Sequence, residues 1–213
     1  MERTPEEAKA HHISVMGQQL GEVYATLWQE LALLCRNWNE YVELFGTKSS
    51  RVELLNRAAG SFFRLVQDAL WEQTLLHIAR LTDPAASVGK SNLSIRRLLD
   101  CIDDDAIRSF VARKVDAALE AAKFCRDWSN RRIAHRDLDV ALKRNAKPLA
   151  SASREKVRNA LDRLADVLNA VSHKYLDSET HILGSWYPGG AISLLHLLDS
   201  GAHLQGQRTD KAR

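Results

Sequence analysis

One stretch of ten residues concentrates the side chains that could do chemistry. It runs from Trp128 to Asp137 with the sequence WSNRRIAHRD, and it holds one histidine, three arginines and a carboxylate. A histidine whose charge changes near neutral pH can move a proton, and arginine stays charged and binds phosphate through a planar fork of donors. Together these groups are the minimum chemistry for cutting RNA without a metal.

The same cluster also has a purely structural interpretation. Arginines near the C-terminal end of a helix offset its dipole, and His135 could simply cap the last carbonyls. If an α-helix continues through the cluster, about 100° per residue puts Arg131 and Arg132 on the face of His135. On that geometry Arg126 lies on the opposite face and Ile133 points toward the core. Spacing alone leaves both interpretations open.

Other motifs carry less weight. Val88-Gly89-Lys90-Ser91 resembles the end of a phosphate-binding P-loop, but that pattern needs glycine where this chain has Pro84, and it needs a preceding strand. The eight histidines include no HxxxH pair, so we expect no metal site and no cofactor. Most of the five tryptophans fall on apolar helix stripes, which leaves Trp128 as the one candidate for base stacking.

Composition is typical of a soluble globular protein. The chain has 213 residues, of which 45% are hydrophobic and 27% charged, enough for one domain with a core. No apolar run approaches the ~20 residues that cross a bilayer. The first residues lack the apolar core of a signal peptide. We therefore expect a cytoplasmic protein without membrane contact. The three cysteines, Cys35, Cys101 and Cys125, show no CxxC spacing, which predicts buried free thiols.

Positive charge is unevenly distributed along the chain. The net charge is only +3, yet residues 126–163 hold eleven Lys or Arg against five Asp or Glu, a local charge of +6. A basic segment on a nearly neutral protein favours a polyanionic partner. A solvated helix face is the alternative explanation.

The elements that must position the cluster are predicted to be helices throughout, because apolar residues recur at spacings of three and four. Phe62 and Phe110 fall on these apolar stripes. A capping box at Thr4–Glu7 starts the first helix, which breaks near Gly17. The later helices are expected from Leu20 to Phe45, from Ser49 or Ser50 to Leu81, from Asn92 or Ser94 to about Ile102, from Asp103–Asp105 into the Arg/His cluster, and from Ser153 to Tyr175.

No strand is expected, so the predicted fold class is an all-α antiparallel helical bundle. We place the bundle in residues 1–180 and a short C-terminal helical appendage in residues 181–213, with a frayed tail.

The helical pattern, taken together with Asp127–Leu138, resembles the HEPN superfamily (higher eukaryotes and prokaryotes nucleotide-binding), in particular its abortive-infection AbiU-like branch. The resemblance covers roughly residues 15–175. Further stretches that fit this branch are Leu27-Trp28, Trp38–Tyr41, Leu44–Gly46, Val66–Glu72 and Ala79–Pro84.

The resemblance implies a HEPN-like bundle that forms a homodimer in which two Arg/His motifs face each other. It further implies a metal-independent ribonuclease of phage-defence or toxin–antitoxin systems. The family motif is an arginine, four to six residues, then a histidine, which is His135 here. Arg131 is one position too close and Arg126 too far. The positions where the arginine should stand hold Trp128, Ser129 and Asn130. A tyrosine that is modified in the toxin branch is replaced by Asp137.

These considerations define the candidate site. The expected catalytic residues are His135 for proton transfer with Arg131 and Arg132 as phosphate clamps. The further RNA- or phosphate-binding residues are expected to be Arg126, Asn130, Arg136 and Asp137. The expected partners are RNA, a second copy of the chain, and a cognate antitoxin or another defence-system protein. The alternative, favoured by the missing arginine, is a catalytically inactive HEPN domain that binds RNA, a nucleotide or another protein.

Overall fold

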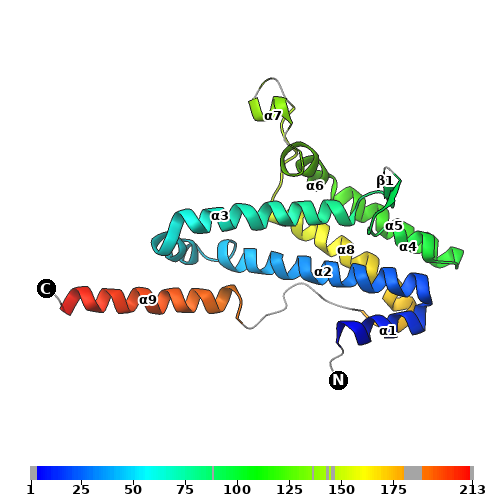
Figure 1. Cartoon of the computed structure of the whole chain (residues 1–213), viewed down its shortest axis with the longest axis horizontal. Helices are drawn as coiled ribbons and strands as arrows, with labels where there is room; N and C mark the ends of the chain where they lie inside the picture. The colour runs from blue at the N-terminus through cyan, green and yellow to red at the C-terminus, as the bar shows by residue number, and fades with distance from the viewer. Residues whose placement is uncertain are drawn as a thin grey trace. The chain divides into compact units, whose positions relative to one another are not determined.

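The computed structural model describes residues 4–87, 89–135, 137–142, 144, 147–179 and 189–211, with side chains described as far as residue 203. Within these residues the fold is all-α, as predicted, apart from one short hairpin (Figure 1). The elements are α1 (Pro5–Met16), α2 (Gln18–Phe45), α3 (Ser49–Leu81), β1 (Ala86–Ser87), β2 (Lys90–Ser91), α4 (Arg97–Cys101), α5 (Asp105–Ala121), α6 (Lys123–Trp128), the π-helical turn η1 (Ser129–Ile133), α7 (Leu138–Leu142), α8 (Arg154–Leu176) and α9 (Ala191–Lys211).

Local sequence signals explain where most helices begin and end. The capping box of α1 is confirmed, because the Thr4 hydroxyl accepts from the Glu7 N–H at 3.2 Å and the Glu7 carboxylate accepts from the Thr4 N–H at 2.8 Å. Gly17 has a φ of 83° and separates α1 from α2. The side chains of Asp104 and Ser153 cap α5 and α8 at the predicted positions.

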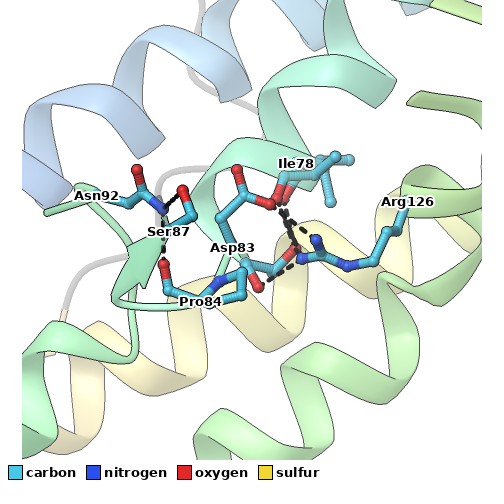
Figure 2. A network of polar contacts seen from close by, with 8 residues as sticks. Ile78, Asp83, Pro84, Ser87, Asn92 and Arg126 are labelled. Atoms are coloured by element: carbon cyan, nitrogen blue, oxygen red, sulfur yellow. Dashed lines mark hydrogen bonds and ion pairs between the residues drawn. The ribbon is translucent and has the colours of Figure 1, made fainter. Parts of the chain in front are cut away.

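The hairpin between α3 and α4 was not predicted. Ala86 pairs with Ser91, and Ser87 pairs with Lys90. Asn92, expected to cap the next helix, instead closes this loop: its amide donates to the Pro84 carbonyl at 2.9 Å and to the Ser87 hydroxyl at 3.1 Å (Figure 2). Helix α4 therefore begins at Arg97 without a side-chain cap.

Two aromatic residues assigned to the apolar stripes are largely exposed. Helix α3 is interrupted at Ala59, where φ is −163° and ψ is 66°, so the apolar stripe does not continue straight through this point. Phe62, just after the kink, is 59% exposed. Phe110 on α5 is also exposed, and its ring lies beneath the cationic groups of Arg113 and Lys114.

The chain divides into two compact units. The first unit contains Met1–Cys35 and Leu75–Ile182, and the second contains Arg36–Thr74 and Leu183–Arg213. The structure thus groups α9 with the middle of the chain, whereas the sequence suggested an appendage added after residue 180. Helix α9 also continues to Lys211, through the segment expected to be frayed.

The core of the first unit forms where α5 packs along α8, with α1 against α8 and α4 against α5. Between α2 and α3, the buried ring of His77 contacts the Glu30 carboxylate at 2.8 Å. One set of core side chains, drawn from α2, α3, α8 and the turn before α4, meets without leaving room for a water molecule: Leu27, Leu31, Leu81, Ile95, Leu164 and Leu168.

The second unit has a separate apolar cluster that includes the start of α9. The carboxylate of Glu40 accepts a hydrogen bond from the Ala191 N–H, which satisfies one of the free donors at the beginning of this helix. Gly190 leaves the space that this carboxylate needs, since a Cβ there would clash with it. The buried members of the cluster are Leu44, Leu54, Leu55, Phe63, Ala191 and Leu195.

None of the helices in the described residues combines the length and the apolar character that crossing a bilayer requires.

Candidate functional site

We call residues Arg126–Asp137 the Arg/His segment. It lies in the first unit, where the chain runs from α5 through α6 into the π-helical turn η1. The Ala134 N–H donates to the Ser129 carbonyl at 2.9 Å, a bond that spans five residues rather than the four of an α-helix. The advance of about 100° per residue assumed for a continuous α-helix therefore does not hold here. Ile133, expected to point into the core, is only partly buried. Helical periodicity therefore does not decide which side chains of this segment are exposed.

Arg126 closes the end of α3. Its Nη1 lies 2.7 Å from the Asp83 carboxylate, and its Nη2 donates to the Thr82 carbonyl at 2.6 Å (Figure 2). The last carbonyls of a helix have no partner within the helix, so a cation that bonds to them stabilises the helix end. Two of its nitrogens are thus engaged inside the protein, and phosphate binding by Arg126 stays a prediction.

Three neighbouring side chains fix the loop before α8. The Asp127 carboxylate accepts from the Ala150 N–H at 2.7 Å, and the indole N–H of Trp128 donates to the Ala150 carbonyl at 2.8 Å. Arg131 lies 3.3 Å from Asp127 and donates to the Lys147 carbonyl. The loop at residues 147–150 is thus held by consecutive turns of the Arg/His segment.

The remaining described residues of the segment lie at the surface. Asn130, Arg132 and His135 are all exposed. The guanidinium carbon of Arg132 lies 5.6 Å from the ring centroid of Trp128, so this indole, a candidate for base stacking, already contacts a cation. The side chain of Arg132 is therefore packed against the protein at the surface.

Asp137 marks the start of α7. Its carboxylate accepts from the Val140 N–H at 2.9 Å, and its own N–H donates to the Arg131 carbonyl at 3.2 Å. This is the geometry of a residue that caps a helix N-terminus. Arg136, which was assigned to phosphate binding, lies outside the described residues.

The structure therefore separates the segment into two groups. Arg126, Asp127, Trp128 and Arg131 hold α3 and the 147–150 loop, whereas Asn130, Arg132 and His135 face solvent. In such a segment an exposed imidazole can move a proton and an exposed guanidinium can oppose the charge of a phosphate. We call Asn130, Arg132 and His135 the exposed triplet.

Sequence reasoning overlooked the structural role of Asp127. Its spacing of four residues from Arg131 on a helix is a local signal that could have suggested the ion pair. The pair of Arg126 with Asp83 has no such signal, because 43 residues separate the two in the chain.

Across the described residues, no three His, Cys, Asp or Glu side chains gather as a metal site would require.

Comparison with known proteins gives one match. Residues 17–188 match the family model HEPN_AbiU2, described as AbiU2, and this range covers most of the chain. Neither the curated proteins nor the solved structures include a match.

Proposed function

The chain belongs to the AbiU2 family of HEPN proteins, and from this premise we propose that it cleaves RNA without a metal in abortive infection. The observation that carries the proposal is the exposed triplet. Its side chains are exposed, while Asp127 and Trp128 of the same segment are fixed by hydrogen bonds to the 147–150 loop. A site built on a supported backbone keeps its geometry when substrate binds.

The proposed reaction uses the ribose of the substrate as the nucleophile. The 2′-hydroxyl attacks the neighbouring phosphorus and loses its proton, the bond to the 5′-oxygen breaks, and that oxygen gains a proton. His135 is the group that exchanges these protons. Arg132 opposes the negative charge that builds on the phosphate oxygens, a contribution worth about 3–4 kcal/mol, or 10²–10³ in rate. The products are a 2′,3′-cyclic phosphate and a 5′-hydroxyl.

Arg131 has a different part in this proposal from the one its sequence position suggested. Its side chain is 21% exposed and pairs with Asp127. It holds the 147–150 loop and adds positive charge to the segment that carries the exposed triplet. Arg132 is then the side chain that contacts phosphate directly.

We place the complete site between two copies of the chain. One His135 and one exposed arginine approach a phosphate from one side only, whereas a two-fold pair supplies a second set from the other. An antitoxin or another defence-system protein would inhibit cleavage by covering this surface. RNA as the substrate places the activity in the cytoplasm.

Cleavage in the presence of EDTA tests the enzymatic proposal. Purified protein should cut single-stranded RNA and leave 2′,3′-cyclic phosphate ends. His135→Ala should abolish cleavage without changing the thermal unfolding curve, because His135 is exposed. His173→Ala, another exposed histidine of the same unit, is the matched control and should cleave normally. Cleavage that persists in the His135 variant would refute this role.

One observation favours the alternative, a HEPN domain that binds RNA without cutting it. Arg126 and Arg131 both serve the fold, and none of the positions where the family arginine would stand holds one. Asn130→Arg tests this directly. Asn130 is exposed, whereas Ser129 is only 8% exposed and has no room for a longer side chain. Cleavage by this variant but not by the natural protein would identify a decayed nuclease.

A further inference from the structure

The second unit contains an open pocket, and none of its lining residues belongs to the Arg/His segment. Its volume is about 310 Å³, at the lower end of the range of small-molecule sites. The beginning of α3 forms one wall and the first turns of α9 form the other. The beginning of α3 and the whole of α9 belong to the second unit.

The lining of this pocket is strongly basic. Lys48, Arg51 and Arg57 carry permanent positive charge, and Asp199 is the one carboxylate among the lining residues. The Asp199 carboxylate is 59% exposed and lies 3.7 Å from His203, toward the rim. Glu43 pairs with Arg51, so Lys48 and Arg57 leave an excess of positive charge around this concave surface, which an anionic ligand would offset.

Arg51 is held in place for binding. Its Nη1 donates to the Thr47 hydroxyl at 2.7 Å and to the Glu43 carbonyl at 2.9 Å, and it pairs with the Glu43 carboxylate. Among the described residues, Nη1 is the donor in every hydrogen bond that this guanidinium makes. These bonds fix a guanidinium that lines the pocket, and a side chain that is fixed before a ligand arrives loses less entropy when the ligand binds.

The floor of the pocket is apolar. Leu54 and Leu195 line it and are each only 7% exposed, and Ile192 lies beside them. A bare inorganic anion would leave this floor without a partner. A ligand with an apolar or flat ring system next to its charge would cover it.

We propose that this pocket binds a small phosphorylated molecule with a ring system, of the nucleoside phosphate class. The fixed guanidinium and the two further cations match a phosphate that carries more than one negative charge. The apolar floor matches the ring. This site goes beyond the proposed function and involves none of its residues.

Calorimetric titration of the full chain tests the ligand class. At low ionic strength ADP should bind, adenosine should not bind measurably, and pyrophosphate should bind more weakly than ADP because it leaves the floor uncovered. Raising the salt concentration should weaken ADP binding, since the attraction is between opposite charges.

Four variants locate the site. Lys48→Ala and Arg57→Ala should each weaken ADP binding about tenfold, as expected for the loss of one charge-assisted contact. Asp199→Asn should tighten it about threefold by removing the opposing charge, a gain that misfolding cannot produce. Arg64→Ala is the control: this arginine lies on the same helix, is 73% exposed and pairs with Asp68, so its removal should leave binding unchanged.

Three results would overturn the proposal. ADP could fail to bind at low salt, Arg64→Ala could weaken binding as much as Arg57→Ala, or a single-stranded RNA oligonucleotide could bind through Lys48 and Arg57 where ADP does not. His135→Ala should leave ADP binding intact. The pocket and the proposed nuclease site can therefore fail independently.

Discussion

Asp127 uses both carboxylate oxygens inside the protein, and this decides how its neighbours act. One oxygen accepts from the Ala150 N–H and the other pairs with Arg131. Arg131 is consequently held against the 147–150 loop, while Arg132 one position later is exposed and packs over Trp128. At the scale of the residue, two adjacent arginines thus have different roles, since Arg131 holds a loop and Arg132 is exposed.

Replacing each arginine in turn should separate these roles. Arg131→Ala should lower the free energy of unfolding by about 1–3 kcal/mol, because Asp127 and the Lys147 carbonyl lose a partner. Arg132→Ala should lower stability by less, because a contact such as the one with Trp128 is worth about 0.5–1 kcal/mol, but it should weaken single-stranded RNA binding and reduce its salt slope by about 1. Urea denaturation and RNA titrations at several salt concentrations measure both. Equal effects of the two variants on stability would contradict this division.

The cysteines predict how stability responds to high pH. Burial raises the pKa of the Cys35 and Cys125 thiols to about 12, from an ordinary 9.0. Since the pKa is higher in the folded state, the stability that these thiols contribute is complete below pH 9 and is lost as pH rises from 9 toward 12. Unfolding curves measured across this pH range should show the loss.

The same burial should make thiol labelling selective. At pH 8, iodoacetamide should modify Cys101 first, because it is only partly buried, and Cys35 and Cys125 only when the protein unfolds. Mass spectrometry of the labelled peptides would identify the order. Fast labelling of Cys125 in the folded protein would contradict its buried environment.

At the scale of the element, the end of α3 depends on a side chain from α6. Arg126 bonds to the Thr82 carbonyl and to Asp83 at the point where Pro84 prevents the helix from continuing. This contact ties the helix that precedes the exposed triplet to the core of the first unit. It is a structural contact in a segment for which the sequence left a structural interpretation and an RNA-binding interpretation open.

Arg126→Met should therefore destabilise the fold by about 2 kcal/mol, because it removes charged hydrogen bonds to a helix end. Lys123→Met on the same helix is the control. Its ammonium is 72% exposed and pairs only with Glu120 among the contacts described, so a change of less than about 0.5 kcal/mol is expected. If Arg126→Met weakened RNA binding without any loss of stability, the structural role would be wrong.

Helix boundaries were predictable from the sequence because their signals are local. Thr4 with Glu7, Gly17 and Pro84 each act within a few residues, and the structure confirms all three boundaries. The interruption at Ala59 also has a local signal, because Gly60 and Ser61 follow it and helices often kink at such a pair, but no kink was predicted there. The hairpin at residues 86–91 is too short for a period-of-two pattern to show.

The candidate site was predictable only in part. The residue types of the Arg/His segment indicated its chemistry, and the family match supports its identity. Which arginines face solvent was not predictable, because this depends on contacts with Asp83 and Ala150, which are distant in the sequence. Helical periodicity could not substitute for those contacts, because the π-helical turn breaks it.

At the scale of the whole molecule, each unit has its own apolar core and its own basic feature. The first unit carries residues 126–163 and the second carries the pocket around Arg51. The net charge of +3 over the entire chain conceals both features. Local distribution of charge is therefore the property that bears on anionic partners.

Oligomeric state is the prediction that belongs to this scale. A site with one exposed arginine and one histidine needs a second copy, so light scattering at micromolar concentration should give twice the chain mass of 24.0 kDa. Mixing His135→Ala subunits with subunits that carry Arg132→Ala should then show whether the two copies share a site. A monomer under these conditions would contradict the shared site.

The π-helical turn at Ser129–Ile133 also bears on insertions and deletions. A turn closed across five residues contains one residue more than an α-helical turn closed across four, so it stores a single-residue insertion without lengthening either flank. Deletion of one residue inside it would restore α-helical bonding and leave Trp128 and Asp137 at their anchors. The number of residues between an arginine and His135 therefore does not fix the distance between their side chains. Homologous chains can place the two side chains alike with different numbers of residues between them.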